Sequence, residues 1–316
     1  MSRVINGDVI LDSAPEQAEK FRLDHLLVEK YQSYNRSSLQ TFIKSGFVKV
    51  DGVVVTKANA KFEKSAKLEL NVPAIDKKSD LVPTIIYEDQ FVLVLNKPAG
   101  LLSMAKGEYC PEKTLEDYGL LVHRLDRDTS GVVILAKDPE TQAFLRKQFQ
   151  DRKTHKTYYA ITEGIPKKDE ALIDLPIERN FKRPNTFLVT PNGKPSETYY
   201  KVLEKSAAGR ALVELKPKTG RTHQLRVHLN YLGTPILGDP VYGAGYSTDL
   251  TRPNKSKVAN KSAHKSSAPS ADRLYLHAYS LEITIKNPAN PAEKLRETFV
   301  ADLPENFRAM LNAPAK

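Results

Sequence analysis

The side chains best placed to do chemistry lie in a charged stretch at residues 123–131. It reads His-Arg-Leu-Asp-Arg-Asp-Thr-Ser-Gly and leads directly into the aliphatic run 132–136. A polar loop that enters a buried strand is held by the sheet, so it can present reactive groups in a cleft. From spacing alone, Asp126 is either a reactive carboxylate or a turn residue, and the same choice is open for Asp128. The stretch therefore indicates a site without fixing its reaction.

A serine hydrolase is one chemistry that these residue types allow, with His123, Asp126 and Ser130 as a triad. Three triad members so close in sequence rarely converge on one point, and the sequence has no Gly-x-Ser-x-Gly elbow. We therefore do not favour a hydrolase.

The elements expected to hold this loop are strands mixed with a few helices. Alternating or β-branched runs predict strands at residues 85–87, 91–95, 132–135, 156–162, 198–203, 211–215 and 281–285. Helical spacing predicts helices at residues 139–149 and 222–231. Because strands and helices mix without regular βαβ alternation, we expect an α+β domain around a mixed, largely antiparallel sheet.

The first part of the chain predicts a smaller unit of two helices and a hairpin. Leu23, Leu26 and Leu27 have helical spacing, and a second helix follows, capped by Ser37 or Ser38 and stopped at Gly46. The pair Asp51-Gly52 separates two valine-rich runs, which is a strong hairpin signal. A further strand is expected at residues 67–72.

Composition changes along the chain predict the domain boundaries. We expect a flexible arm at residues 1–19, a first domain at 20–73, a linker at 74–84 and a second domain at 85–316. A stretch rich in Lys and Ser at about 249–272 lacks large apolar residues, which is typical of a solvated insertion.

The charge balance favours a polyanionic partner. Lys and Arg total 48 against 38 Asp and Glu, giving a net charge of +10 and a pI near 9.3. The chain has no long apolar run, so nucleic acid is favoured over a membrane. The single cysteine, Cys110, cannot form an internal disulfide and has no Cys or His at metal-ligand spacing. We expect a cytoplasmic protein without a bound metal, and a monomer.

Residues 123–131, with the strand that follows, resemble the signature of the RluA-type RNA pseudouridine synthases. Residues 96–101 (Asn-Lys-Pro-Ala-Gly-Leu) and 156–160 (Lys-Thr-Tyr-Tyr-Ala) are similar to two further segments of that family. A third similar segment begins at Thr219 and continues to Gly243, and all occur in the family's order. The resemblance implies a pseudouridine synthase catalytic domain that isomerises uridine in RNA without a cofactor.

The same resemblance implies the catalytic residues. Asp126 matches the family's essential carboxylate, which attacks the sugar or base or removes a sugar proton. Such a carboxylate needs a neighbouring cation to stay charged. Arg226 matches that basic residue, and Arg221 is its rival. Tyr158 matches the tyrosine whose ring stacks on the uracil.

Other residues are expected to contact RNA. The resemblance implies that Arg124 helps to hold the target nucleotide out of its helix. Lys97, Arg221 and His223 are further predicted RNA contacts, Lys97 through phosphate. His123 is predicted to be structural or RNA-contacting.

The first domain is similar to the ribosomal protein S-four type of RNA-binding module. The similarity rests on Arg22-Leu23-Asp24, on Arg36, and on a pattern of Gly and Val that runs to Gly52. It implies that Arg22 and Arg36 contact RNA, although either could be an ordinary solvated charge.

Together these patterns predict an RNA pseudouridine synthase that acts on large-subunit ribosomal RNA. The alternatives are a synthase that acts on transfer RNA and a noncatalytic RNA-binding or ribosome-assembly protein.

Overall fold

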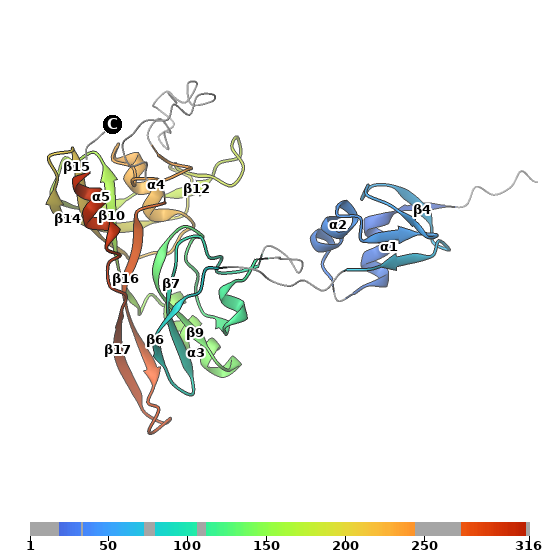
Figure 1. Ribbon diagram of the computed structural model, residues 1–316, viewed down its shortest axis with the longest axis horizontal. Helices are drawn as coiled ribbons and strands as arrows, with labels where there is room; N and C mark the ends of the chain where they lie inside the picture. The colour runs from blue at the N-terminus through green and yellow to red at the C-terminus, as the bar shows by residue number, and fades with distance from the viewer. Residues whose placement is uncertain (1–18, 33, 73–79, 106–111, 244–272, 314–316) are drawn as a thin grey trace, which may run out of the picture. The chain divides into compact units, whose positions relative to one another are not determined.

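The computed structural model describes residues 19–32, 34–72, 80–105, 112–243 and 273–313. The described residues up to 72 form one compact unit, and those at 80–104, 112–243 and 273–313 form a second, larger one (Figure 1). The predicted linker at 74–84 lies partly outside the described residues, and its last residue, Thr84, begins a strand. The predicted insertion at 249–272, Cys110 and all but the last residue of the predicted arm also lie outside them.

The first unit contains the two predicted helices and the predicted hairpin. Its elements are β1 (Lys20–Arg22), α1 (Leu23–Lys30), α2 (Arg36–Lys44), β2 (Val48–Val50), β3 (Val53–Val54), β4 (Lys61–Glu63) and β5 (Leu68–Leu70). One sheet pairs β1 with β4, and another has the order β3-β2-β5. The hairpin is confirmed, because Asp51 and Gly52 both have positive φ angles, 50° and 80°, as a type I′ turn requires.

Two details of this unit differ from the prediction. The cap of α2 is Asn35, whose side chain accepts a hydrogen bond from the Ser38 amide at 3.0 Å. Ser37 and Ser38 are wrong as caps, because the helix already begins at Arg36 and both serines lie within it. The strand predicted at residues 67–72 is shorter, with ladder pairing only over β5.

The second unit is built on one sheet of ten strands with the order β11-β14-β15-β10-β16-β9-β7-β6, in which β17 also pairs with β16 and β8 with β9. Its strands are β6 (Thr84–Glu88), β7 (Val92–Lys97), β8 (Leu120–Leu121), β9 (Ser130–Ala136), β10 (His155–Glu163), β11 (Glu170–Asp174), β14 (Glu197–Lys205), β15 (Arg210–Pro217), β16 (Leu276–Lys286) and β17 (Lys294–Val300). Every pairing is antiparallel except that of β16 with β9. The predicted α+β fold with a mixed, largely antiparallel sheet is confirmed.

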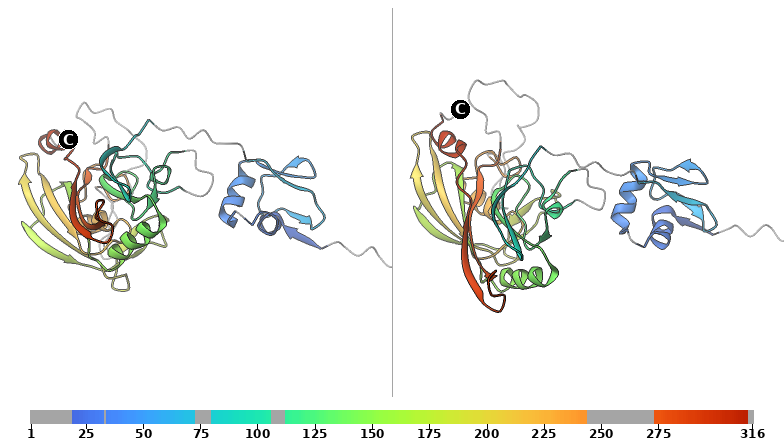
Figure 2. Two further views of the ribbon diagram at one scale, coloured as in Figure 1. Left: turned by 90° about the horizontal axis from the view of Figure 1, so that it is seen from below. Right: turned by 60° about the horizontal axis from the view of Figure 1, so that its bottom comes forward.

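Helices and a small hairpin complete the second unit. They are η1 (Leu115–Asp117), α3 (Pro139–Gln150), α4 (Gln224–Tyr231), α5 (Asn306–Asn312) and the hairpin of β12 (Ile177–Arg179) with β13 (Phe187–Val189). Helix α3 packs against β9 and β16, whereas α5 packs against β15, and they lie at opposite ends of the unit in both views of Figure 2. The half of the sheet with β7 and β9 packs against α3 in one apolar core, and the half with β10, β14 and β15 packs against α4 in another.

The two halves of the sheet meet at Gly131. Here β9 runs parallel to β16 for only two residue pairs, His277 with Ser130 and Ala278 with Gly131. Gly131 has a φ of 113°, and an added Cβ would lie 2.1 Å from the Ala278 carbonyl oxygen. Only glycine fits this close approach, so the last residue of the charged stretch fixes where its loop enters the sheet.

Candidate active site

Asp126 lies in the loop between β8 and β9, immediately before the junction of the two sheet halves. Its backbone carbonyl accepts a hydrogen bond from the Thr129 amide at 3.1 Å, which closes a turn. Leu125 beside it is buried in an apolar cluster, and its backbone bonds both ways with the Ser103 hydroxyl. The loop is therefore anchored on both sides, with the Asp126 side chain about one-fifth exposed.

Arg226, in the first turn of α4, is the cation that contacts Asp126. Its Nη1 lies 3.3 Å from Asp126 Oδ2, and its Nε and Nη2 each donate to the Asp239 carboxylate at 2.8 Å. The guanidinium also lies over the Tyr242 ring, 5.1 Å from its centroid. Burial alone would lower the pKa of Arg226, but the bonds to Asp239 and the charges of both aspartates raise it above its usual value. The charged guanidinium thus faces Asp126 in a fixed orientation.

Arg221, the rival of Arg226, has a different position. Its Nε donates to the Pro195 carbonyl at 3.3 Å, and its amide donates to the Gln224 side chain at 3.0 Å. It lines the same cavity, but among the described residues the ion pairs of Asp126 are with Arg226 and His223 and not with Arg221. The geometry thus matches the preference for Arg226 over Arg221 as partner of the carboxylate.

Asp239 was not predicted as a site residue. It follows the Gly238 turn, its side chain is fully buried, and its Oδ1 accepts from the Val241 and Tyr242 amides at 2.9 Å each. These bonds fix the carboxylate that orients Arg226. Its place within the similar segment 219–243 was the only signal available, because spacing alone does not reveal a partner thirteen residues from Arg226.

Tyr158 lies on β10 and faces the cavity. It packs in the same apolar clusters as Leu125 and Leu276. Burial, and then the negative charge of Asp126, raise the pKa of the Tyr158 hydroxyl well above its usual value. The ring is therefore a neutral phenol near the carboxylate. Tyr159 stacks instead with Tyr279, with ring centroids 4.6 Å apart, as strand alternation predicts.

His223 is the residue before α4 and has a left-handed φ of 57°. This conformation explains why the helix begins at Gln224 rather than at Thr222. The His223 Nδ1 lies 2.8 Å from the Tyr242 hydroxyl, and its Nε2 lies 3.9 Å from Asp126 Oδ2. Burial lowers the pKa of His223, with Asp126 opposing that shift. Its predicted contact with RNA stays a prediction.

Lys97 is wrong as a phosphate contact. The residue is fully buried, and its amine donates to the carbonyls of Pro98, Leu101 and Arg127 at 2.7–3.0 Å. Burial lowers the pKa of Lys97 to about 7, against the raising effect of Asp128 and Asp126. Strand β7 also continues through Lys97, beyond the predicted end at residue 95. The lysine thus ties the loop at residues 98–101 to the loop that carries Asp126.

His123 and Ser130 belong to separate structural contacts rather than to a triad. The His123 ring stacks on Phe149 with centroids 4.5 Å apart and accepts a bond from the Ile134 amide. Ser130 Oγ bonds instead to His277 Nδ1 at 2.8 Å. The serine hydrolase arrangement is therefore not assembled.

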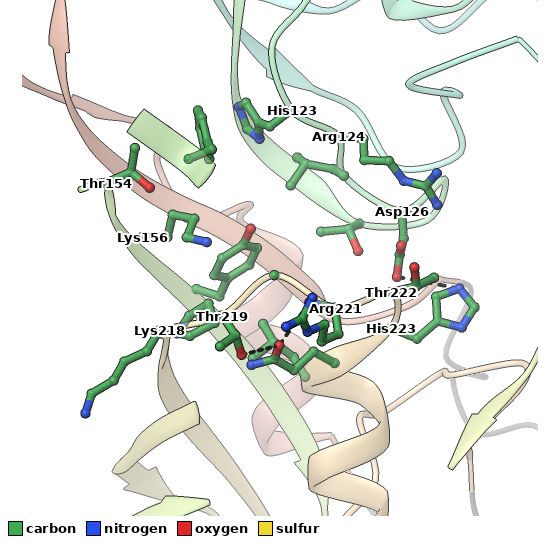
Figure 3. A pocket seen from close by; sticks show the side chains of 18 of the residues that line it. His123, Arg124, Asp126, Thr154, Lys156, Lys218, Thr219, Arg221, Thr222 and His223 are labelled. Atoms are coloured by element: carbon green, nitrogen blue, oxygen red, sulfur yellow. Dashed lines mark hydrogen bonds and ion pairs between the residues drawn. The ribbon is translucent and has the colours of Figure 1, made fainter. Parts of the chain in front are cut away.

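A cavity of about 590 Å³ extends from Asp126 along β10 (Figure 3). Among its lining residues Asp126 is the single carboxylate, whereas the lining cations are Arg124, Arg152, Lys156, Lys218, Arg221 and Arg226. This volume lies within the range of about 300–1,000 Å³ that holds small organic ligands. The cavity is thus suited to an anionic ligand of nucleotide size.

In the first unit, Arg22 and Arg36 both bind Asp24, which is fully buried. Together with Gln40 they donate five hydrogen bonds to its carboxylate. Burial opposes ionisation of Asp24, but the bonds to Arg22, Gln40 and Arg36 hold its pKa well below the usual range. Both arginine side chains remain nearly half exposed, so their predicted contact with RNA stays a prediction.

Comparisons with known proteins agree with this geometry. Residues 91–231 match the family model described as RNA pseudouridylate synthase, and residues 21–66 match the S4 domain. A relative described as ribosomal large subunit pseudouridine synthase C, from Buchnera aphidicola, is 33% identical over 92% of this chain and 93% of its own length. The chain belongs to the RNA pseudouridylate synthase family. It is an isomerase that acts on RNA, and it carries an N-terminal S4 domain.

Two further relatives extend the comparison. Ribosomal large subunit pseudouridine synthase D of Nitrosomonas europaea is 32% identical over 98% of this pseudouridine synthase and 88% of the relative. The solved structure of human RNA Pseudouridylate Synthase Domain Containing 4 has a TM-score of 0.53 and 29% identity, covering 72% of this chain and 91% of its own.

Within the residues that the structure describes, no cluster of His, Cys, Asp or Glu could hold a metal ion. None of the described helices is both long and apolar enough to span a membrane.

Proposed function

We propose that this pseudouridine synthase modifies uridine in large-subunit ribosomal RNA, with Asp126 as its essential carboxylate. One observation carries the assignment of the residue. The Asp126 carboxylate faces a nucleotide-sized cavity, and the buried guanidinium of Arg226, itself fixed by Asp239, lies 3.3 Å away.

The reaction conserves every atom of the uridine. The bond between N1 of uracil and C1′ of ribose breaks, the base turns, and a bond forms between C5 and C1′. The proton on C5 leaves and N1 takes one up, so no oxidant, reductant or cofactor is needed. Asp126 acts as the carboxylate on the sugar or base, and Arg226 pairs with it and orients it.

Tyr158 serves as the platform for the uracil. A neutral aromatic ring stacks on any base, and such stacking contributes about 1–3 kcal/mol. Because its pKa is raised, the hydroxyl remains protonated at neutral pH and does not act as a phenolate base. The negative charge of Asp126 acts on this hydroxyl and adds to the rise in its pKa.

Cationic residues at the cavity hold the target nucleotide after it leaves its stack. Taking a base out of a helix costs a few kcal/mol, which contacts with phosphate must offset. Arg124, two residues before Asp126, is exposed at the cavity wall and supplies one such contact. Arg221 and His223 supply others, and Arg22 and Arg36 of the first unit bind RNA outside the cavity.

The choice of ribosomal RNA rests on the relatives. The two full-length relatives above are described as ribosomal large subunit synthases, and both align with nearly the whole of this chain. We place the enzyme in the cytoplasm, together with that RNA. We propose that it acts as a monomer, because one chain supplies every residue that is assigned a role.

The test is release of tritium from transcripts of large-subunit RNA that carry the label at C5 of every uridine. The native enzyme should release the label to water, and Asp126→Asn should not. Asp128→Asn, which changes the neighbouring carboxylate of the same loop, is the matched control and should release it. Equal release by the native enzyme and Asp126→Asn would refute the role of Asp126. Release from labelled transfer RNA but not from large-subunit RNA would make transfer RNA the substrate. No release from either RNA would favour a noncatalytic RNA-binding protein.

A further inference from the structure

Lys156 is a lysine of the cavity to which the reaction gives no role. It lies two residues before Tyr158 on β10, so both side chains are on the same face of the strand and about 7 Å apart along it. In Figure 3 Lys156 points into the cavity from the side opposite Asp126. The cavity therefore continues past the tyrosine platform to a second cation.

The amine of Lys156 has no anionic partner in the protein. Among the residues that the structure describes, none makes a hydrogen bond or ion pair with it. Burial lowers the pKa of Lys156, and no carboxylate offsets that effect. Lys156 is partly buried. A cation that is partly withdrawn from water without a partner is unfavourable, and natural proteins rarely retain one unless it binds something.

There is open space beside this amine. A Cβ added at Gly220, on the facing loop, would meet only the Lys156 amine, at 3.9 Å, and no other heavy atom within 4 Å. The backbone of Gly220 thus leaves room for a ligand group next to the lysine.

We propose that Lys156 binds a phosphate of the RNA strand next to the target uridine. This inference rests on the proposed function, because it takes the uracil to lie on Tyr158. A nucleoside on that platform, with its sugar near Asp126, fills the cavity between the carboxylate and Lys156, so the phosphate that Lys156 binds belongs to the RNA strand that runs past the uracil and not to the target's own ribose. The cavity then holds a nucleotide together with part of its neighbour's backbone.

A phosphate fits this position better than the edge of a base. A base edge is neutral and would leave the partly buried ammonium without a counter-charge, whereas a phosphate supplies one. The charge of the cavity agrees, since Arg152 also lines it. Lys218 does not compete, because it points away from the cavity in Figure 3 and lies 3.3 Å from Glu197.

The test compares Lys156→Gln, Lys156→Arg and Lys201→Gln in the Asp126→Asn background, which binds RNA without turnover. Lys201 is an exposed lysine of β14 outside the cavity and serves as the matched control. Affinity for an unmodified large-subunit RNA transcript is measured from low to high KCl concentration. Loss of one phosphate contact lowers the slope of log Kd against log salt by about 0.7 for single-stranded RNA.

We expect Lys156→Gln to lower that slope by this amount and to weaken binding about tenfold at low salt. Lys156→Arg and Lys201→Gln should keep the parent's slope. Thermal unfolding without RNA adds a second readout. Since Lys156→Gln removes an unpaired, partly buried charge, it should not lower the Tm, whereas loss of a purely structural lysine would.

Two results would overturn the proposal. One is an unchanged slope in Lys156→Gln, which together with weaker binding would indicate a neutral base edge. The other is an equal fall in slope for Lys201→Gln. Tritium release by the otherwise native enzyme from the same transcript tests the proposed function separately. Release together with an unchanged slope would refute the Lys156 site alone.

Discussion

Replacement of Arg226 by Lys tests whether the geometry of the cation, and not only its charge, is needed. The guanidinium makes three hydrogen bonds to two carboxylates, two to Asp239 and one to Asp126. A lysine amine cannot form the bidentate pair, and we expect it to keep about one of the three. Each bond to a charged group contributes about 1.5–3 kcal/mol. The free energy of unfolding of the larger unit should therefore fall by about 3 kcal/mol or more.

Activity should fall as well, because Asp126 loses its fixed partner. A misplacement of about 1 Å lowers a rate by roughly a hundredfold. We expect a loss of that size in kcat, measured as single-turnover tritium release at saturating enzyme. Stability is followed by circular dichroism in urea, since the chain has no tryptophan.

Arg221→Lys is the matched control, in the same loop and helix region. The variant keeps the charge, and Arg221 makes no ion pair with another described residue, so the free energy of unfolding should change by less than about 1 kcal/mol. Its effect on activity should appear in KM. If Arg221→Lys reduces kcat a hundredfold while Arg226→Lys leaves it unchanged, the assignment of Arg226 is refuted.

Three further predictions concern stability. Gly131→Ala should destabilise the larger unit by more than about 3 kcal/mol, because the new Cβ collides with the Ala278 carbonyl. Gly220→Ala is the control and should not destabilise it, because its Cβ meets only one atom, at 3.9 Å; equal melting curves for the two variants would contradict this. Burial lowers the pKa of His228 to about 4, so below pH 6.5 the native state binds fewer protons than the unfolded state, and the free energy of unfolding falls as the pH falls. Between pH 7 and pH 5, urea unfolding should show a loss about 2 kcal/mol smaller in His228→Gln than in the native protein, and equal losses would exclude this role of His228. Asp24→Asn should speed amide hydrogen exchange in the first unit, because it weakens the bonds from two arginines and so lowers the free energy of opening by about 1–3 kcal/mol. Unchanged exchange would contradict the structural role of Asp24.

Patterns with a local physical cause could be predicted from the sequence. The type I′ hairpin follows from Asp51-Gly52, and the opposite faces of Tyr158 and Tyr159 follow from strand alternation. The strand after Asp126 follows from its aliphatic run. Helix α3 also agrees, because its capping residue Asp138 and Pro139 mark its start.

Features that depend on tertiary contacts could not be predicted in this way. Lys97 reads as a surface charge, but three carbonyls from two loops enclose its amine. The role of Asp239 depends on a turn that directs it at Arg226. The start of α4 was misplaced by two residues because nothing local indicates the left-handed conformation of His223. In each case a long-range packing contact determines the position.

If Asp126 is the essential carboxylate, the enzyme isomerises uridine in large-subunit ribosomal RNA only when this residue is present. Pseudouridine in that RNA is mapped after incubation with the native enzyme or with Asp126→Asn, through carbodiimide modification and primer extension. We expect new stops at defined uridines with the native enzyme and none with Asp126→Asn. The same stops with both proteins, or no stops with either, would contradict it.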